Sequence, residues 1–267
     1  MIYIALPAYN EAENVETLLA DIGANMQELM PVSDFQVVVV NDGSSDNTRE
    51  AAEAARERLI PQYPRLHIEV VNHSQNRGLA EALKTGLKYC ADKAGPRDII
   101  LTMDCDNSHT PGLIPRLARR IREGYDVVIA SRYVPGAQIY GLASSRLLLS
   151  YAASVIMRLF FPIRGVRDYT CGFRAYRAEV IKDLFARNPG IISERGFTVM
   201  LDVLIKLHKF SPGLTFGEVP LLLRYDLKKG ASKMNVQSTT LRTLKLIWRR
   251  RLGYWDMDEA TQTEGQH

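Results

Sequence analysis

Residues 101–111 read LTMDCDNSHTP, and this stretch decides most of what the sequence predicts. The apolar run 99–103 stops at two carboxylates with one residue between them. Residues two apart in a strand point to the same side, so Asp104 and Asp106 should share one face while Cys105 packs inward. Two carboxylates on one face repel each other unless a cation lies between them. We therefore expect a divalent metal, Mg²⁺ or Mn²⁺, that also binds a diphosphate at this strand end; the simpler alternative is a solvated turn.

Short apolar runs rich in β-branched residues alternate with amphipathic segments through the first half of the chain. Such alternation is typical of βαβ units and predicts an α/β fold, a Rossmann-like and mainly parallel sheet flanked by helices. The expected strands are 2–6, 35–40, 66–71, 99–103 and 127–130, and the expected helices start at residue 12 and cover 46–59, 78–92 and 111–123.

Polar residues follow every predicted strand at the point where the chain leaves the sheet. Ligands of such sheets bind beyond the carboxyl ends of the strands. One polar segment could be simple turn or cap chemistry, whereas five at one edge predict a binding site. The five segments are 7–11, 41–46, 72–78, 104–106 and 131–133.

Composition is ordinary: the 267 residues are 46% hydrophobic and 24% charged, which is typical of a folded globular protein. The net charge of +4 gives no reason to expect nucleic acid as a partner. Cys90, Cys105 and Cys171 lack the spacing of metal ligands, so we expect free thiols in a reducing compartment. The chain start predicts a strand rather than a signal sequence.

Four motifs in order resemble those of glycosyltransferase family 2, whose members are inverting enzymes with the GT-A fold. The motifs are a Pro-x-Tyr-Asn-Glu start, an Asp-Gly-Ser-x-Asp-x-Thr turn, an Arg-Gly pair before a helix, and Asp-x-Asp. The resemblance covers residues 1–235, which we expect to form one GT-A domain. It rests on Pro7, Tyr9, Asn10, Glu11, Asp42, Gly43, Ser44, Asp46, Thr48, Arg77, Gly78, Asp104 and Asp106.

Within that family, the second half is similar to the dolichyl-phosphate, or polyprenyl-phosphate, mannosyltransferases. This resemblance implies GDP-mannose as the donor and a polyprenyl phosphate as the acceptor. Ser108 replaces a glutamine of the subfamily pattern and Asn41 replaces an aspartate, which leaves UDP-glucose or a related donor open. The resemblance is carried by residues 131–136, 168–174 and 218–220, with Arg146, Ser150, Arg224, Gly230, Ser232 and Lys233.

The resemblance assigns the two sides of the site. Asp104 and Asp106 would hold the metal on the donor diphosphate, where the ion stabilises charge on the leaving group. The nucleotide base and ribose would lie against Pro7, Tyr9, Asn10, Glu11, Asp42 and Arg77, with Asp104 beside them. An acceptor phosphate needs cations with bidentate geometry, which suits arginine. The acceptor phosphate site would comprise Arg132, Arg146, Ser150, Arg174, Arg224, Ser232 and Lys233.

The resemblance implies four catalytic residues: Asp106, Arg132, Arg224 and Asp168. The role of Asp168 has two interpretations. In relatives that glycosylate a hydroxyl, an acid near this position serves as general base. A phosphate acceptor is already ionised near neutral pH and needs no base, so Asp168 would instead orient the cations around the acceptor. We favour the orienting role.

Two segments of the second half suggest contact with a membrane. The apolar segment 142–163 is interrupted by Arg146 and Arg158, and its uncharged interior is shorter than the ~20 residues that span a bilayer. It is either a core helix or an interface helix at the bilayer surface. The segment 239–252 predicts a basic amphipathic helix with an apolar stripe of Leu241, Leu244, Trp248 and Leu252, within a C-terminal region of 236–267 that ends in a polar tail.

The sequence therefore predicts inverting transfer of a sugar, by resemblance mannose, from a nucleotide sugar to a polyprenyl phosphate. The expected location is cytoplasmic, peripheral at the cytoplasmic face of the membrane, with a membrane-anchoring subunit as a further possible partner. One alternative is a family 2 enzyme with another donor or a hydroxyl acceptor. The other is a non-catalytic protein that binds a nucleotide sugar or a lipid phosphate, which the intact Asp104 and Asp106 disfavour.

Overall fold

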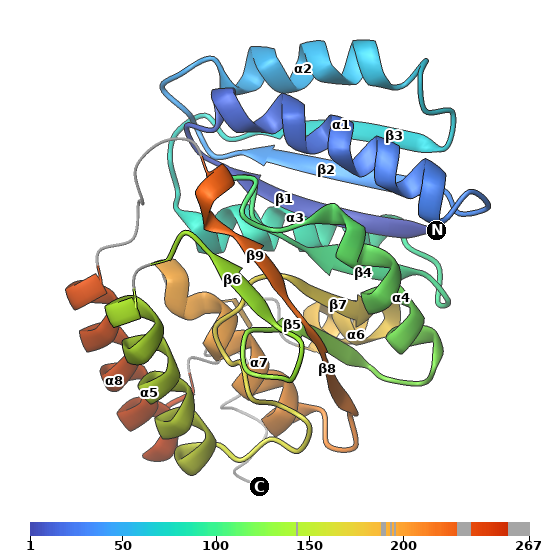
Figure 1. Cartoon of the computed structure of the whole chain (residues 1–267). Helices are drawn as coiled ribbons and strands as arrows, with labels where there is room; N and C mark the ends of the chain where they lie inside the picture. The colour runs from blue at the N-terminus through green and yellow to red at the C-terminus, as the bar shows by residue number, and fades with distance from the viewer. Residues whose placement is uncertain (143, 188–190, 193, 195, 229–235, 256–267) are drawn as a thin grey trace, which may run out of the picture.

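Strands and helices alternate from the first residues, and they build a central seven-stranded sheet (Figure 1). The computed structural model describes residues 1–142, 144–187, 191, 192, 194, 196–228 and 236–255, without the side chains of 144–146, 148, 149, 197 and 236–240. The strands of the large sheet are β1 (Ile2–Ala8), β2 (Phe35–Asn41), β3 (Leu66–Asn72), β4 (Ile99–Thr102), β5 (Val127–Ser131), β7 (Arg174–Arg177) and β8 (Phe216–Pro220).

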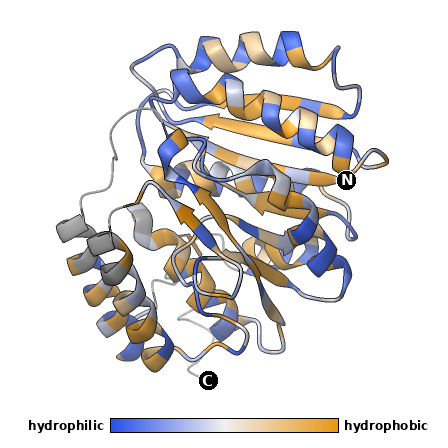
Figure 2. Ribbon diagram, viewed as in Figure 1, coloured by the Kyte–Doolittle hydropathy of each residue, from blue (hydrophilic) through white to orange (hydrophobic). Residues whose placement is uncertain are grey.

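The sheet order is β3-β2-β1-β4-β7-β5-β8, and every pairing except the two of β7 is parallel. β1 and β2 pair in register from Ile2 opposite Phe35 to Ala8 opposite Asn41. The four valines of 37–40 are all fully buried because helices cover both faces of the sheet, and Figure 2 shows these strands as apolar. The predicted α/β class and its five predicted strands are confirmed.

Helices lie on both faces of the sheet (Figure 1). α3 (Leu79–Lys93) packs on β1 and β2, with α6 (Ala178–Arg187) beside it. The opposite face carries α1 (Ala12–Leu29) with α2 (Thr48–Leu59), and the turn η1 (Pro111–Leu113) that leads into α4 (Ile114–Arg122) packs against α1. The remaining helical elements are α5 (Ser144–Phe160), η2 (Gly196–Thr198), α7 (Val199–Phe210), η3 (Tyr225–Leu227) and α8 (Val236–Arg251).

β7 enters the sheet antiparallel between β4 and β5, which the apolar pattern did not predict. Its sequence is Arg-Ala-Tyr-Arg, and Arg174 and Tyr176 are nevertheless completely buried between β4 and β5. A separate two-stranded sheet pairs β6 (Gln138–Tyr140) with β9 (Leu222–Arg224). Leu223 of β9 bridges to His109, so this small sheet crosses over the turn that follows β4.

α5 and α8 lie side by side at one end of the molecule (Figure 1). α8 buries Leu246 and Ile247, whereas the predicted apolar stripe is exposed: Leu241 by 69%, Leu244 by 44%, Trp248 by 68% and Leu252 by 61%. α5 likewise exposes Leu159 and Phe160. No helix among the described residues is both long enough and apolar enough to cross a membrane.

A buried ion cluster fixes α8 to α7. Nε of Arg250 in α8 donates to Oδ1 of Asp202 at 2.7 Å, and Nζ of Lys206 lies 2.7 Å from the other oxygen of Asp202. The side chains of all three residues are at most 1% exposed. Glu194 adds a second carboxylate 3.2 Å from Arg250. Because a buried charge without its partner is costly, this cluster holds the inner face of α8 on the domain.

Candidate active site

The loops after β1 and β2 are joined by hydrogen bonds. The backbone N–H of Asn10 donates to Oγ of Ser44 at 3.0 Å, and Oδ1 of Asn10 accepts the N–H of Ser45 at 2.9 Å. Asn10 has a φ of 51°, a left-handed conformation that asparagine tolerates better than most residues. The N–H of Glu11 donates to Oγ1 of Thr48 at 2.8 Å. These contacts place the predicted nucleotide segment, Pro7 to Glu11, beside the turn after β2.

Asp42 lies beneath this surface rather than on it. It is 2% exposed, and its Oδ1 lies 2.7 Å from Nδ1 of His73 and accepts the N–H of Arg77 at 3.0 Å. Its Oδ2 accepts the N–H of Gly78 at 2.7 Å, at the start of α3. The carboxylate therefore fixes the loop that presents the exposed Arg77 side chain.

The turn after β4 has the alternation that the sequence predicts. Met103 and Cys105 are buried among apolar side chains, and Asp104 and Asp106 point to the other side. The N–H of Asp104 donates to Nδ1 of His109 at 3.1 Å, and Nε2 of the same ring lies 3.9 Å from Oδ2 of Asp104. Asp104 keeps part of its surface in solvent, yet desolvation of its carboxyl raises its pKa, and Asp106 adds to the rise.

Asp106 is the more enclosed carboxylate. Its Oδ1 accepts hydrogen bonds from the N–H of Ser108 at 3.1 Å and from its hydroxyl at 2.5 Å. Its Oδ2 lies 2.5 Å from Nζ of Lys228, which directly follows η3. Burial opposes ionisation of Asp106, but Lys228, the Ser108 hydroxyl and His109 together hold the pKa of Asp106 below its usual range.

These residues suit a hard divalent cation. Both donors are carboxylate oxygens, the ligands that Mg²⁺ and Mn²⁺ prefer, and the ammonium group of Lys228 shows that Asp106 attracts a cation at this point. The described residues contain no group of three His, Cys, Asp or Glu side chains that could hold a metal together. A metal on Asp104 and Asp106 would therefore need further oxygens from a ligand such as a diphosphate and from water.

Asp168 and Arg132 form a second pair, in which the Asp168 side chain is fully buried and that of Arg132 is 16% exposed. Nε and Nη2 of Arg132 each donate at 2.7 Å, one to each oxygen of Asp168. The backbone N–H groups of Arg132, Thr170 and Cys171 donate to the same carboxylate at 3.1, 3.2 and 3.1 Å. Burial opposes the charge of Asp168, but Arg132 and these bonds hold its pKa below the ordinary value. Burial opposes the charge of Arg132 as well, and Asp168 reverses this and raises the arginine pKa.

The segment after Asp168 connects the Arg132–Asp168 pair to the two carboxylates Asp104 and Asp106. A Cβ on Gly172 would lie 3.2 Å from Oδ1 of Asp104, so the backbone passes close to the carboxylate. Oγ1 of Thr102 donates to the carbonyl of Gly172 at 2.7 Å. The charge of Arg132 lowers the pKa of Asp104, against the larger effect of desolvation. The paired carboxylates and Arg132 thus belong to one site.

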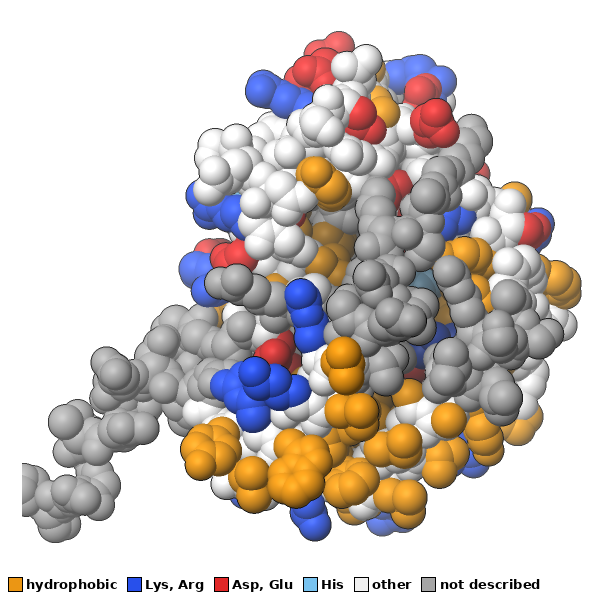
Figure 3. Space-filling model, turned by 90° about the vertical axis from the view of Figure 1, so that its left-hand side faces the viewer, with side chains coloured by type: hydrophobic (Ala, Val, Ile, Leu, Met, Phe, Trp, Pro, Cys, Tyr) orange, Lys and Arg blue, Asp and Glu red, His pale blue; other side chains and the backbone are white. Residues whose placement is uncertain are grey.

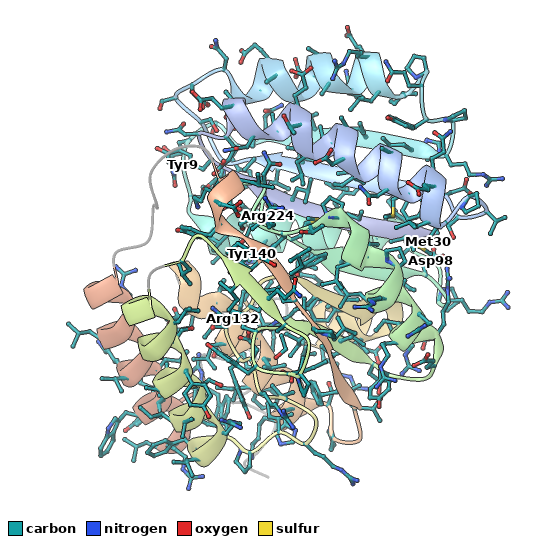
Figure 4. The ribbon with its side chains drawn as sticks, viewed as in Figure 1. Tyr9, Met30, Asp98, Arg132, Tyr140 and Arg224 are labelled. Atoms are coloured by element: carbon teal, nitrogen blue, oxygen red, sulfur yellow. The ribbon has the colours of Figure 1, made fainter. Side chains whose placement is uncertain are left out.

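Arg224 approaches that site from β9. It is 37% exposed, its guanidinium lies 5.6 Å from the ring centre of Tyr140, and its Nη2 pairs with Asp226 at 2.8 Å. Figure 4 shows Arg224, Tyr140, Arg132 and Tyr9 toward the carboxyl ends of the strands, whereas Met30 and Asp98 lie at the opposite end. The hydroxyl of Ser150 in α5 is 2.6 Å from the hydroxyl of Tyr133, the residue that follows Arg132 in the chain.

One expected residue does not fit its predicted place. Arg174 is fully buried, and its guanidinium donates to the carbonyls of Cys171, Met200 and Tyr169 at 2.8, 2.7 and 2.8 Å. We correct its assignment from phosphate ligand to a residue that fixes the chain around β7. The side chain of Arg146, and all of Ser232 and Lys233, lie outside the described part of the chain.

The fold brings two further residues to the carboxylates: His109, which the sequence suggests only as a turn or helix-cap histidine without a role, and Lys228, which the sequence does not single out. His109 has its ring stacked on Phe173, with centroids 5.2 Å apart, beside Asp104. Lys228 reaches Asp106 from a position 122 residues later in the chain. His109 lies in the same turn and could have been suspected, whereas no sequence signal links Lys228 to Asp106.

The chain matches the family model "Glycosyl transferase family 2" over residues 3–185. Dolichol-phosphate mannosyltransferase of Pyrococcus furiosus is 34% identical over 204 residues, which cover 76% of this chain and 52% of the relative. The chain thus spans about half the length of that relative. Undecaprenyl-phosphate mannosyltransferase of Micrococcus luteus is 30% identical over 230 residues, which cover 86% of each chain.

Solved structures share the fold. Glucosyl-3-phosphoglycerate synthase of Mycobacterium tuberculosis, in complex with Mn²⁺, UDP and glucosyl-3-phosphoglycerate, has a TM-score of 0.62 at 21% identity, covering 96% of this chain and 81% of its own. A mannosyltransferase of Pyrobaculum calidifontis in complex with GDP-Man and Mn²⁺ has a TM-score of 0.54 at 19% identity, covering 94% of this chain and 64% of its own.

Proposed function

This chain belongs to glycosyl transferase family 2, and we propose that it transfers mannose from GDP-mannose to the phosphate of a polyprenyl phosphate, with inversion at the sugar carbon. The relatives from Pyrococcus and Micrococcus carry names with this type of acceptor. The observation that carries the proposal is the state of Asp168. Its carboxylate accepts five hydrogen bonds and has a lowered pKa, so it is a poor general base. An ionised phosphate acceptor needs no general base.

On the donor side, Asp104 and Asp106 would hold Mg²⁺ or Mn²⁺ on the diphosphate. The ion would supply positive charge to the leaving nucleoside diphosphate. The joined loops of Asn10, Ser44 and Ser45 present backbone and side-chain groups suited to a base and a ribose. Arg77 extends from the loop that Asp42 fixes.

On the acceptor side, Arg132 and Arg224 would bind the phosphate and direct one of its oxygens at the sugar carbon. Asp168 acts as a positioning residue because it holds Arg132 in a bidentate pair, which leaves the Nη1 edge of the guanidinium for another anion. Ser150, and Arg146 on the same helix, would assist from α5. Ser232 and Lys233 remain expected phosphate contacts on the subfamily resemblance.

The apolar surface of α5 and α8 would meet the lipid. Figure 3 shows apolar side chains gathered over the lower part of the face that these helices form. The two helices expose Tyr151, Leu159 and Phe160 of α5 and Leu241 and Trp248 of α8, all by more than 40%. Each large apolar side chain that leaves water contributes about 1.5–3 kcal/mol, so a few suffice for peripheral binding. The basic residues of α8 would favour the anionic cytoplasmic face, with or without an anchoring subunit.

A direct assay tests this function. Purified chain with Mn²⁺ is given GDP-mannose, UDP-glucose or other nucleotide sugars, and either a short polyprenyl phosphate or the matching polyprenol. We expect sugar transfer to the polyprenyl phosphate, fastest from GDP-mannose, and a product of inverted anomeric configuration. Transfer to the polyprenol alone would favour the hydroxyl-acceptor alternative, and the absence of transfer from every donor would contradict the proposal.

A further inference from the structure

Lys228 satisfies one oxygen of Asp106 as completely as a metal would. Its Nζ lies 2.5 Å from Oδ2, and the side chains of the two residues are only 13% and 11% exposed. The other oxygen of Asp106 already accepts two hydrogen bonds from Ser108. Lys228 is therefore a close cationic partner of the carboxylate.

A divalent metal and this ammonium group exclude each other. A metal bound to Asp106 would lie about 2.1 Å from a carboxylate oxygen, so at Oδ2 the metal and the ammonium group would be only a few ångströms apart. Like charges at that separation, shielded from water, repel strongly. Metal binding through Oδ2 of Asp106 requires Lys228 to leave.

Lys228 has a short path to a new partner. A phosphate oxygen bound to the same metal lies within ~4–5 Å of Oδ2, which the four-carbon stem of lysine spans by rotation. Among the described residues, the ammonium group also lies 5.5 Å from the ring centre of Tyr225 and interacts electrostatically with Glu11 and Asp104. A π-face contact of this kind is weak and does not fix a direction.

We infer that Lys228 is an exchangeable cation: it neutralises Asp106 before the donor binds, and it transfers to the donor diphosphate when the metal takes its place. This inference deepens the proposed function. Its second part, the transfer of Lys228 to the donor diphosphate, rests on that function. The exchange keeps the buried carboxylate paired in both states, so neither state leaves an uncompensated charge. It also makes the metal alone a weak ligand and the metal with a nucleoside diphosphate a strong one.

The test measures binding without turnover. Lys228→Met removes the competing charge, Lys228→Arg keeps it, and Lys88→Met removes an exposed lysine that pairs with Asp92 in α3. Mn²⁺ affinity of the nucleotide-free protein is measured by electron paramagnetic resonance of free Mn²⁺. GDP affinity is then measured by calorimetry in saturating Mn²⁺. Thermal unfolding of each variant establishes that it is folded.

We expect Lys228→Met to bind Mn²⁺ alone about tenfold more tightly and GDP in saturating Mn²⁺ about tenfold more weakly, the size of one charge-assisted hydrogen bond. Lys228→Arg and Lys88→Met should match the unsubstituted protein within about twofold in Mn²⁺ affinity. Unchanged or weaker Mn²⁺ binding by Lys228→Met would overturn the competition, and unchanged GDP binding would overturn the transfer. If the unsubstituted chain binds neither GDP nor UDP with Mn²⁺, the proposed function fails instead, while the Mn²⁺ measurement still decides the competition.

Discussion

The proposed acceptor side and the proposed donor side of the site each contain a buried carboxylate and a cation, but the two pairs are built differently. Asp168 accepts five hydrogen bonds, three of them from backbone N–H groups, and its partner Arg132 donates in a planar fork. In the described part of the chain, the second oxygen of Asp106 has one hydrogen-bond partner, Lys228. A backbone-bound, bidentate pair is permanent, whereas a single contact from a flexible lysine can exchange.

The difference follows from what each carboxylate does in the proposed reaction. A phosphate site requires a guanidinium in one orientation, so Asp168 is fixed and fixes Arg132. A metal site has to accept a cation that arrives with its ligand, so Asp106 keeps one oxygen available for exchange. Substitutions in the rigid Arg132–Asp168 pair and in the exchangeable Lys228–Asp106 pair should therefore have different effects.

The largest effect is expected at the exchangeable pair. Asp106→Ala should lower turnover by about a thousandfold or more, because several kcal/mol of charge stabilisation by the metal are lost. The midpoint of thermal unfolding should change little, since Lys228 can turn toward solvent. Turnover and unfolding are measured together, with Asp92→Ala, an exposed acid on α3, as the control. Normal turnover of Asp106→Ala in excess chelator would contradict the metal assignment.

The fixed pair should respond in the opposite way, through stability. Asp168→Asn leaves Arg132 buried and without its counter-charge, which we expect to lower the free energy of unfolding by about 3–5 kcal/mol at pH 7. Denaturant unfolding measures the loss. The pH profile of residual turnover should keep its shape, since Asp168 is not a base for an ionised phosphate. A profile that loses one limb would support a hydroxyl acceptor.

The same variant carries a pH signature. The folded pKa of Asp168 is lowered, so its contribution to stability is complete above the unfolded value of about 4 and is lost as the pH falls further. The unsubstituted protein should therefore lose stability more steeply below pH ~4 than Asp168→Asn. Burial raises the pKa of Glu218 and the charge of Asp168 adds to the rise, so Asp168→Asn also changes Glu218. A raised carboxyl pKa alters stability above the ordinary glutamate value, so this change lies outside the window below pH ~4.

Substitution of Arg224 tests whether this residue contacts the acceptor phosphate or the donor nucleotide. If it contacts the acceptor phosphate mainly in the transition state, Arg224→Ala should lower turnover by about 30- to 1,000-fold, or ~2–4 kcal/mol, with GDP affinity nearly unchanged. Arg49→Ala, an exposed arginine paired with Glu53, serves as the control. Equal losses in turnover and GDP affinity would move Arg224 to the donor side.

The smallest effects are expected at the lipid-facing surface of the acceptor side. Leu159→Ser and Trp248→Ser should each weaken binding to anionic vesicles about five- to twentyfold, or ~1–2 kcal/mol, without changing turnover on a short, water-soluble acceptor. Flotation across a salt series measures the binding. Val32→Ser changes an 83% exposed valine elsewhere on the surface and should have no effect. Equal flotation of all three variants would exclude this surface from membrane contact.

Local pattern was enough for the first half of the fold and for the strand-end positions of the residues expected on the donor side. The valines of β2, the alternation at Asp104 and Asp106, and the polar ends of β1, β2 and β4 are properties of consecutive residues. Period-two alternation and runs of β-branched residues express the physics of a covered parallel sheet directly, so the strands and their order of appearance could be predicted. The apolar stripe of α8 could also be predicted, although whether it faced the core or the solvent could not.

Tertiary structure decided everything that depends on residues distant in the chain. β7 contains two arginines and no apolar run, and it belongs to the sheet only because β4 and β5 pair with it on either side. Arg174 could be told from a phosphate ligand only once three backbone carbonyls surrounded it. Lys228 meets Asp106 because β9 crosses the turn after β4, and Arg250 meets Asp202 because α8 packs on α7. A charge has no periodicity, and its partner is chosen by distance in space and by the cost of leaving it unpaired in a buried place.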